Sequence, residues 1–371
     1  MHVVKYIFIL FIFKNAFLEG SLKQQVGQCF MTLVYGETFT PNIQEFIDKT
    51  AVSNFILFNH TNVLKDLRKV GNLTLNLKNY VQANYRITPL IAIDQEGGVV
   101  ARLSNNCIKW PSQAYIGQNH GFLYSYFMGQ MIGLELNRVG INLNLAPVVD
   151  IAAQDNETML QRCYGTMPEE VISHAMAFIE GLHRQGILTT LKHFPGLGDV
   201  QQDTHKKLGV CNSSFFQLEQ KDLKPFIELS SRTDAIMVSH AIYSAIDPNN
   251  PASVSKAVLE LLRYNYAYDG VVISDSLTMK GLVTDQSTVE KAIEGISKRA
   301  IEAFNAGCDI LIVAKCSWAD FKTNEQVDYH IIEKVVENFA DAVNSGVISK
   351  ERFEEALSRI KRLRAKIPSR Y

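Results

Sequence analysis

Eight short apolar runs, each followed by a stretch of helical periodicity, limit the fold of this chain more than any other feature. The runs are rich in β-branched and aliphatic residues, as buried strands of a parallel sheet are. They cover residues 30–34, 54–59, 89–94, 141–150, 187–194, 235–240, 270–275 and 308–314. Eight strand-helix units predict an α/β fold, a single-domain (β/α)8 barrel, with a doubly wound open sheet as the structural alternative.

The intervals between the runs have the pattern of amphipathic helices. Residues 169–186 carry apolar side chains every three or four positions, and Gly186 stands where the helix is expected to end. Residues 290–307 repeat this pattern with Gly307 at the end, and the tail predicts two more helices, the second capped by Ser349. No linker rich in Gly, Ser or Pro interrupts the chain, so we expect one catalytic barrel over residues 21–371.

The first 20 residues stand apart from this pattern. Lys5 precedes an apolar run over residues 6–13, and the small residue Gly20 offers a cleavage point, which is the layout of a signal peptide. An apolar N-terminal helix packed on the domain is the alternative. The compartment follows from this choice: periplasmic or secreted with a signal peptide, cytoplasmic without one.

Charge and cysteine content exclude several classes of partner and cofactor. The formal net charge is -1, which gives no electrostatic reason to expect nucleic acid or an anionic membrane surface. The six cysteines form no C-x-x-C pair, which argues against a structural zinc site or an iron–sulfur cluster. Function must therefore be sought in a site built from side chains.

Reactive side chains gather at the ends of the predicted strands. Six of the eight runs end in or next to one, and in a barrel the carboxyl ends of all strands meet at one mouth, where barrel enzymes have their active sites. These residues are Asn59, Asp94, Asp150, Lys192 with His193, His240 and Asp275.

Two segments supply groups suited to binding a sugar. In "AIDQEGGVVARL", Asp94 closes a strand, a Gly-Gly pair allows a tight turn, and Arg102 follows. A carboxylate accepts two hydrogen bonds in one plane, which suits paired hydroxyl groups. In "QRCYGTMPEEV", Arg162 stands at the entrance to a helix, although arginines there are mostly solvated or structural.

The segment "KHFPGLGDVQQDTHKKL" combines several reactive groups. Lys192 and His193 leave a strand, and a forced turn leads to Asp203, two residues before His205. In an extended loop residues i and i+2 point the same way, so this carboxylate can support a protonated imidazole, and His205 is a candidate proton shuttle.

Asp275 ends an apolar strand in "VVISDSLTM". A carboxylate at this position suits a nucleophile or a metal ligand. The main structural alternative is that Asp275 is the N-cap of the next helix.

Taken together and in order, these motifs resemble glycoside hydrolase family 3, in particular its β-N-acetylhexosaminidase branch. The family pattern runs D-Q-E-G-G-R-V-x-R-L, N-L-A-P-V-x-D, R-x-F-G, K-H-F-P-G-H-G-D with D-S-H, and S-D-D-L-x-M. The counterparts here read "DQEGGVVARL", "NLAPVVD", "RCYG", "KHFPGLGD" with "DTH", and "SDSLTM". Five ordered motifs match by chance far less often than any one of them.

The resemblance implies a (β/α)8 barrel that releases terminal β-linked N-acetylglucosamine, most plausibly from peptidoglycan fragments, without a metal, a cofactor or an obligatory protein partner. It implies Asp275 as the catalytic nucleophile and His205 as the acid/base, with Asp203 as its partner. The residues that match positions holding the sugar are Asp94, Arg102, Arg162, Lys192 and His193. Three positions depart from the family pattern: Val99, Leu197 and Ser276.

Three other functions remain open on the sequence. One is a metal-dependent barrel hydrolase with Asp199, Asp203 and His205 as ligands. Another is a sugar-binding protein without catalytic activity, against which intact Asp203, His205 and Asp275 argue. The nearest is a β-glucosidase of the same broad family, although those enzymes generally take their acid/base from a second domain that this chain is too short to contain.

Overall fold

The barrel strands lie where the sequence predicts them. The computed structural model describes residues 20–368, apart from residues 60, 63, 65, 104–106, 155, 201–207 and 316–322. Eight parallel strands form one sheet in the order β12-β9-β7-β6-β3-β2-β1-β13. Their bounds are β1 (Phe30–Leu33), β2 (Asn54–Leu57), β3 (Leu90–Ile93), β6 (Leu143–Asn144), β7 (Leu188–Phe194), β9 (Ala235–Val238), β12 (Val271–Ser274) and β13 (Leu311–Val313).

The sheet closes because its two end strands, β12 and β13, also meet. Ser274 donates its backbone N–H to the Ile310 carbonyl over 2.9 Å, and Leu277 donates to the Ile312 carbonyl over 2.9 Å. Ile273 and Ile310 form a parallel bridge at the same seam. The end strands of a doubly wound open sheet do not meet in this way, so the (β/α)8 prediction is confirmed.

One strand is much shorter than predicted. The run over residues 141–150 forms regular strand only at Leu143–Asn144. Pro147 interrupts it, because proline has no backbone N–H to donate to the neighbouring strand. Beyond Pro147 a single bridge, between Val148 and Lys192, continues the pairing with β7.

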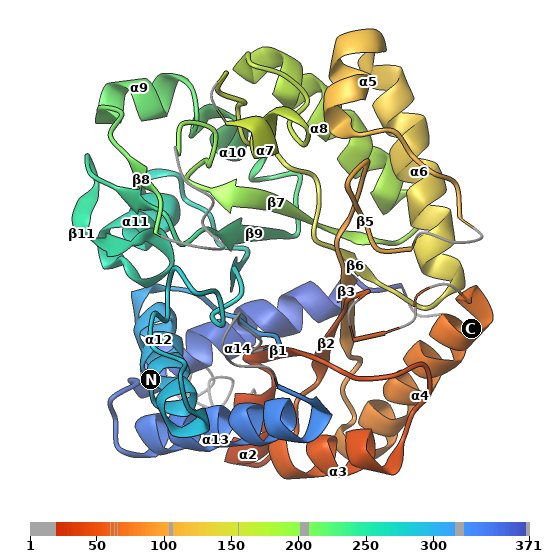
Figure 1. Cartoon of the computed structure of the whole chain (residues 1–371), viewed down its shortest axis with the longest axis vertical. Helices are drawn as coiled ribbons and strands as arrows, with labels where there is room; N and C mark the ends of the chain where they lie inside the picture. Colours follow the sequence, from red (N-terminus) through yellow and green to blue (C-terminus); the bar gives the residue numbers. More distant parts are fainter. Residues whose placement is uncertain are drawn as a thin grey trace, which may run out of the picture.

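Helices connect the strands and surround the barrel (Figure 1). The predicted ends are confirmed for two of them: Gly307 follows α12 with a φ of 137°, and Ser349 caps α14 by accepting the Arg352 N–H. The helix expected to reach Gly186 ends at His183 instead. The bounds are α2 (Leu22–Gly27), α3 (Pro41–Thr50), α4 (Leu67–Tyr85), α5 (Gln113–Asn119), α6 (Phe122–Arg138), α7 (Glu157–Leu160), α8 (Pro168–His183), α9 (Phe215–Gln220), α10 (Lys224–Leu229), α11 (Lys256–Glu260), α12 (Val289–Ala306), α13 (Glu325–Asn344) and α14 (Lys350–Ala365).

Short strands follow three of the barrel strands and build up the mouth of the barrel. After β3, β4 (Gln95–Gly97) and β5 (Val100–Ala101) form an antiparallel hairpin. After β7 and β9, β8 (Val210–Cys211), β10 (Ile242–Tyr243) and β11 (Asp247–Pro251) form a three-stranded sheet. Strands of two or three residues are too short to show a hydrophobic period, so the sequence did not predict them.

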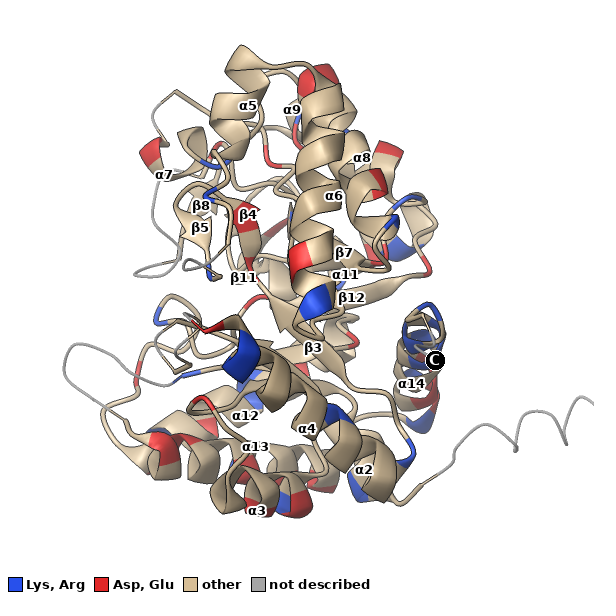
Figure 2. Ribbon diagram, turned by 90° about the vertical axis from the view of Figure 1, so that its right-hand side faces the viewer, with Lys and Arg blue, Asp and Glu red and all other residues tan. Residues whose placement is uncertain are grey.

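Surface charge and the apolar start of the chain are the two features that concern binding partners and compartment. Lys and Arg are interspersed with Asp and Glu over the helices of the face in Figure 2. Among the described residues, no helix is both long enough and apolar enough to cross a membrane. Residues 1–19, which carry the two interpretations of the apolar start, lie outside the described residues.

A buried carboxylate at the barrel seam anchors the C-terminal helix. Asp309 is fully buried before β13, and its Oδ2 accepts the Val272 backbone N–H over 3.0 Å. Arg263 lies 2.6 Å from the same oxygen, while Arg352 of α14 lies 3.0 Å from Oδ1. Because β12 and β13 close the barrel, this ion cluster ties α14 to the closure.

Replacing Asp309 by asparagine should destabilise the fold strongly. The variant leaves the buried guanidinium groups without a counter-charge, which costs about 3–5 kcal/mol when one member of a buried ion pair is removed. Urea unfolding measures this loss. The control is D269N, at an exposed carboxylate paired with Arg359 and Arg362, where a loss below about 1 kcal/mol is expected. Equal losses in the two variants would contradict this role for Asp309.

Candidate active site

A cavity of about 550 Å³ lies at the carboxyl ends of the barrel strands. Six of the residues that the sequence singled out line it together, although they come from four segments far apart in the chain. They are Asp94, Arg102, Arg162, Lys192, His193 and Asp275. Asp203 and His205, the predicted acid/base dyad, lie outside the described residues.

Lys192 is a buried cation held between two carboxylates. Its side chain, on β7, is only 2% exposed, and its Nζ lies 2.8 Å from Asp94 Oδ1 and 2.6 Å from Glu96 Oε1. Arg102 adds a looser contact, 3.7 Å from Asp94 Oδ2. The segment after β3 and strand β7 are therefore held together around one ammonium group.

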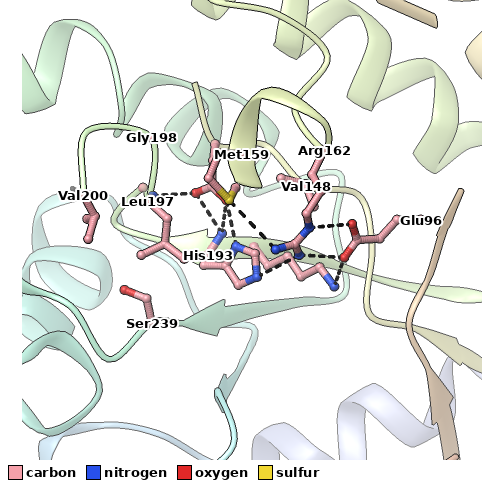
Figure 3. Close-up of polar contacts among 12 residues, drawn as sticks. Glu96, Val148, Met159, Arg162, His193, Leu197, Gly198, Val200 and Ser239 are labelled. Atoms are coloured by element: carbon pink, nitrogen blue, oxygen red, sulfur yellow. Dashed lines mark hydrogen bonds and ion pairs between the residues drawn. The ribbon is translucent and has the colours of Figure 1, made fainter. Parts of the chain in front are cut away.

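Glu96 forms a second ion pair, with Arg162 (Figure 3). The Arg162 guanidinium donates two parallel hydrogen bonds to Glu96, over 3.0 and 2.8 Å. Burial alone would raise the pKa of Glu96, but the charges of Lys192 and Arg162 outweigh burial and hold its pKa at about 2. Glu96 is thus ionised throughout the neutral range.

Asp150 fixes the orientation of His193. The buried carboxylate of Asp150 accepts the His193 backbone N–H and lies 2.7 Å from His193 Nδ1. Its Oδ1 also accepts the Leu197 backbone N–H over 2.8 Å. On the other side of the ring, His193 Nε2 lies 3.4 Å from the Arg162 guanidinium. The imidazole is therefore clamped between a carboxylate and a cation.

The β4–β5 hairpin presents Arg102 to the cavity. Gly97 and Gly98 have φ values of 97° and 60°, as the predicted tight turn requires, and a Cβ atom on Gly97 would lie 2.5 Å from the Pro111 carbonyl oxygen. The Gln95 side chain accepts the Arg102 N–H over 2.8 Å. Val99, which departs from the family pattern, is 66% exposed at the tip of this hairpin.

Asp275 lies directly after β12 on the wall of the cavity. Its backbone N–H donates to the Val238 carbonyl, and its Oδ1 accepts the Ser276 N–H over 2.7 Å. The N-cap alternative is wrong, because the next helix, α12, begins at Val289 and Thr288 caps it. Asp275 thus lines the cavity without beginning a helix.

The metal-site alternative has one of its three ligands, Asp199, in the described residues. Asp199, one of its three ligands, forms an ion pair with Lys221 over 2.5 Å and accepts a hydrogen bond from Ser213. Within the described part of the chain, no group of three or more His, Cys, Asp or Glu side chains is arranged to hold a metal ion. The other two ligands, Asp203 and His205, lie outside that part.

The sequence model of the glycosyl hydrolase family 3 N-terminal domain matches residues 21–363. The chain therefore belongs to glycosyl hydrolase family 3. This assignment covers the barrel and both tail helices, and it agrees with the resemblance seen in the motifs.

One curated relative and two solved structures are each similar to this chain over most of its length. The beta-hexosaminidase A of Pseudoalteromonas piscicida is 30% identical over 94% of this chain. A family 3 β-N-acetylglucosaminidase structure from Paenibacillus sp. FPU-7 has 31% identity and a TM-score of 0.84, covering 95% of this chain and 64% of that one. A β-N-acetylhexosaminidase structure from Beutenbergia cavernae has 27% identity and a TM-score of 0.80, covering 94% and 99%.

This family 3 chain spans only part of its curated relatives. It matches 58% of the length of the Pseudoalteromonas protein and 65% of that of a beta-hexosaminidase from Tolumonas auensis.

Two groups in the site were not assigned a role from the sequence. Glu96 follows Asp94 by two positions, and the alternation of a strand would have placed both side chains on one face. Asp150 was noted only as a residue at a strand end. Its contacts with His193 and Leu197 depend on how the turn after β7 folds back, which the local sequence does not indicate.

Replacing Glu96 by glutamine should reduce stability at pH 7 by about 3 kcal/mol, because it leaves two buried cations with one carboxylate fewer. The pKa of Glu96 is lower in the folded chain than its ordinary value of 4.5, so its stabilisation is present above pH 4.5 and is lost as the pH falls toward about 2. Denaturant unfolding of both proteins at pH 7 and pH 3 measures the difference, which should narrow at pH 3.

The matched control is E302Q, at a partly exposed pair with Arg299, where the loss should stay below about 1 kcal/mol at both pH values. An E96Q variant as stable as the parent at pH 7 would contradict the role given to Glu96.

Proposed function

We propose that this family 3 chain is a retaining exo-β-N-acetylglucosaminidase. One observation carries the proposal: Asp275 lines the same cavity as a cluster of positively and negatively charged side chains that can form hydrogen bonds with a sugar. The names of its relatives, beta-hexosaminidase and β-N-acetylglucosaminidase, support the same sugar.

The charged cluster is suited to hold the terminal sugar. Asp94 keeps acceptor capacity for a pair of hydroxyl groups, while Lys192 and Arg102 supply donors beside it. Arg162, between α7 and α8, supplies further donors, and the His193 ring lies beside it. Ion pairs within the cluster hold these groups in place before the sugar arrives, which lowers the entropy cost of binding.

The reaction proceeds in two displacements. In the first, a carboxylate oxygen of Asp275 attacks the anomeric carbon, the bond to the leaving oxygen breaks, and that oxygen takes a proton from His205. In the second, neutral His205 removes a proton from water, whose oxygen attacks the anomeric carbon and returns Asp275 to its carboxylate form. Asp203 supports the protonated form of His205 that is present before the first step and re-formed by the second.

Replacing Asp275 by alanine should lower kcat/KM for p-nitrophenyl β-N-acetylglucosaminide by at least about a thousandfold, because the nucleophile is lost. Azide added to D275A should restore p-nitrophenol release and give the α-glycosyl azide, since the small anion enters from the face that Asp275 leaves empty. The azide product is identified by NMR spectroscopy.

The control is D285A, at an exposed carboxylate paired with Lys291, which should keep its activity. Near-parental activity of D275A would contradict the assignment, as would a β-configured azide.

We infer further that the leaving group carries an acidic group, as N-acetylmuramic acid does in peptidoglycan fragments. Lys315, just beyond β13, lines the cavity, and it makes no ion pair or hydrogen bond with another described residue. The other cations lining the described cavity wall, Arg102, Arg162 and Lys192, each have a carboxylate partner. An ammonium that has no partner among the described residues favours a substrate that brings its own carboxylate.

Replacing Lys315 by methionine should lower kcat/KM for N-acetylglucosaminyl-N-acetylmuramic acid by about fivefold, the equivalent of about 1 kcal/mol for a partly exposed ion pair. The value for chitobiose, which has no carboxylate, should stay unchanged. Product release is followed by chromatography, and K256M at an exposed lysine is the control. Equal losses on both substrates would contradict the role of Lys315.

A further inference from the structure

Asp222 is a buried carboxyl group whose side chain has no hydrogen-bond partner in the described part of the chain. The residue is only 1% exposed, and neither of its side-chain oxygens accepts a hydrogen bond from another described residue. Burying an ionised carboxylate in this way is costly, so native structures seldom do it without a reason. The group lies between α9 and α10, away from the cavity wall.

The Asp222 side chain packs against the turn that follows β7. A Cβ atom on Gly196 would lie 2.8 Å from the Asp222 Cβ, and a Cβ atom on Gly198 would lie 3.5 Å from Asp222 Oδ1. Gly196 also has a φ of 131°, which other residues rarely adopt. The turn over residues 195–200 thus closes directly onto this carboxyl group.

The same turn is connected to the sugar-binding cluster. Tyr243 donates its hydroxyl hydrogen to the Gly196 carbonyl over 2.6 Å. The Leu197 N–H donates to Asp150. The same carboxylate also accepts the His193 backbone N–H and lies 2.7 Å from His193 Nδ1. Opening the turn would therefore release one of the bonds that hold Asp150 against His193.

Charged and titratable groups surround Asp222 on several sides. Burial, followed by the nearby Asp199 carboxylate, raises the pKa of Asp222 to about 8, with Lys221 opposing and Asp150 adding to the rise. Burial also raises the pKa of Cys163, Cys211 and Tyr243. These three groups therefore stay neutral at neutral pH.

We propose that Asp222 is a positioning residue whose neutral carboxyl group lets the 195–200 turn close and so keeps Asp150 and His193 in place. Proton loss from Asp222 puts a negative charge beside Asp199 and Asp150, and the turn loosens to admit water. Only the last link, from His193 to sugar binding, rests on the proposed function.

Opening of the 195–200 turn is expected to become more favourable as the pH rises. The closed turn raises the pKa of Asp222 to about 8 from its ordinary 3.8, so opening the turn releases a proton between these pH values. Opening therefore becomes more favourable by up to about tenfold per pH unit in this range and levels off above pH 8. A neutral asparagine at the same position has no such dependence.

The test compares amide hydrogen exchange of the full-length parent protein and D222N at pH 6 and pH 8. The ratio of parent to variant exchange at the Leu197 amide should rise by at least about tenfold between these pH values. Peptides from α13 should exchange alike in both proteins, which separates a local effect from a loss of global stability. D269N, which makes the same change at an exposed site, should match the parent throughout.

A ratio that stays constant with pH would overturn the proposal, and so would a D222N variant that exchanges faster than the parent at both pH values or fails to fold. Exchange needs no substrate, so these results are independent of whether the chain hydrolyses N-acetylglucosaminides.

In an active enzyme, D222A should raise KM for the aryl glycoside more than it lowers kcat, and D222N should restore KM at pH 6. A loss confined to kcat would contradict the positioning role.

Discussion

The placement of the Lys192 ammonium between Asp94 and Glu96 is the interaction on which the site depends most. A cation as deeply buried as this one is stable only with counter-charges, and both of its partners come from the segment directly after β3. Glu96 in turn binds Arg162, and Arg162 reaches His193. The strand ends of the barrel are thus joined by alternating charges, and the hydrogen-bonding groups that face the cavity are fixed before a ligand binds.

A second carboxylate links this cluster to the turn after β7. Asp150 orients the His193 ring and at the same time holds the Leu197 amide of the turn. Asn156 holds the turn from another side, since its amide donates to the carbonyls of Leu197, Gly198 and Val200. The turn therefore belongs to the architecture of the charged cluster, and the chain that leads on to Asp203 and His205 starts from a fixed position.

The sequence predicted the barrel because each strand and its covering helix leave a local hydrophobic pattern. The strand ends then indicated Asp94, Lys192, His193 and Asp275, since parallel strands bring their carboxyl ends together. Glu96 and Asp222 were not predicted, because their environment is made by segments distant in sequence. Nothing in "QKDLKPF" distinguishes a buried carboxyl group from a residue at the start of a helix. The length of β6 was predicted wrongly because apolar character continues to Asp150, whereas regular strand ends at Asn144 and only a single bridge pairs the chain with β7 beyond Pro147.

The central claim is that Asp275 forms a covalent bond to the sugar. Incubating the protein with an activated 5-fluoro-N-acetyl-β-glucosaminide, whose fluorine slows both displacements, and analysing its peptides by mass spectrometry tests this claim most directly. The account predicts one fluorinated N-acetylhexosaminyl adduct per chain, on the peptide that contains Asp275. An unlabelled protein that instead releases the α-anomer of N-acetylglucosamine as its first product would contradict it.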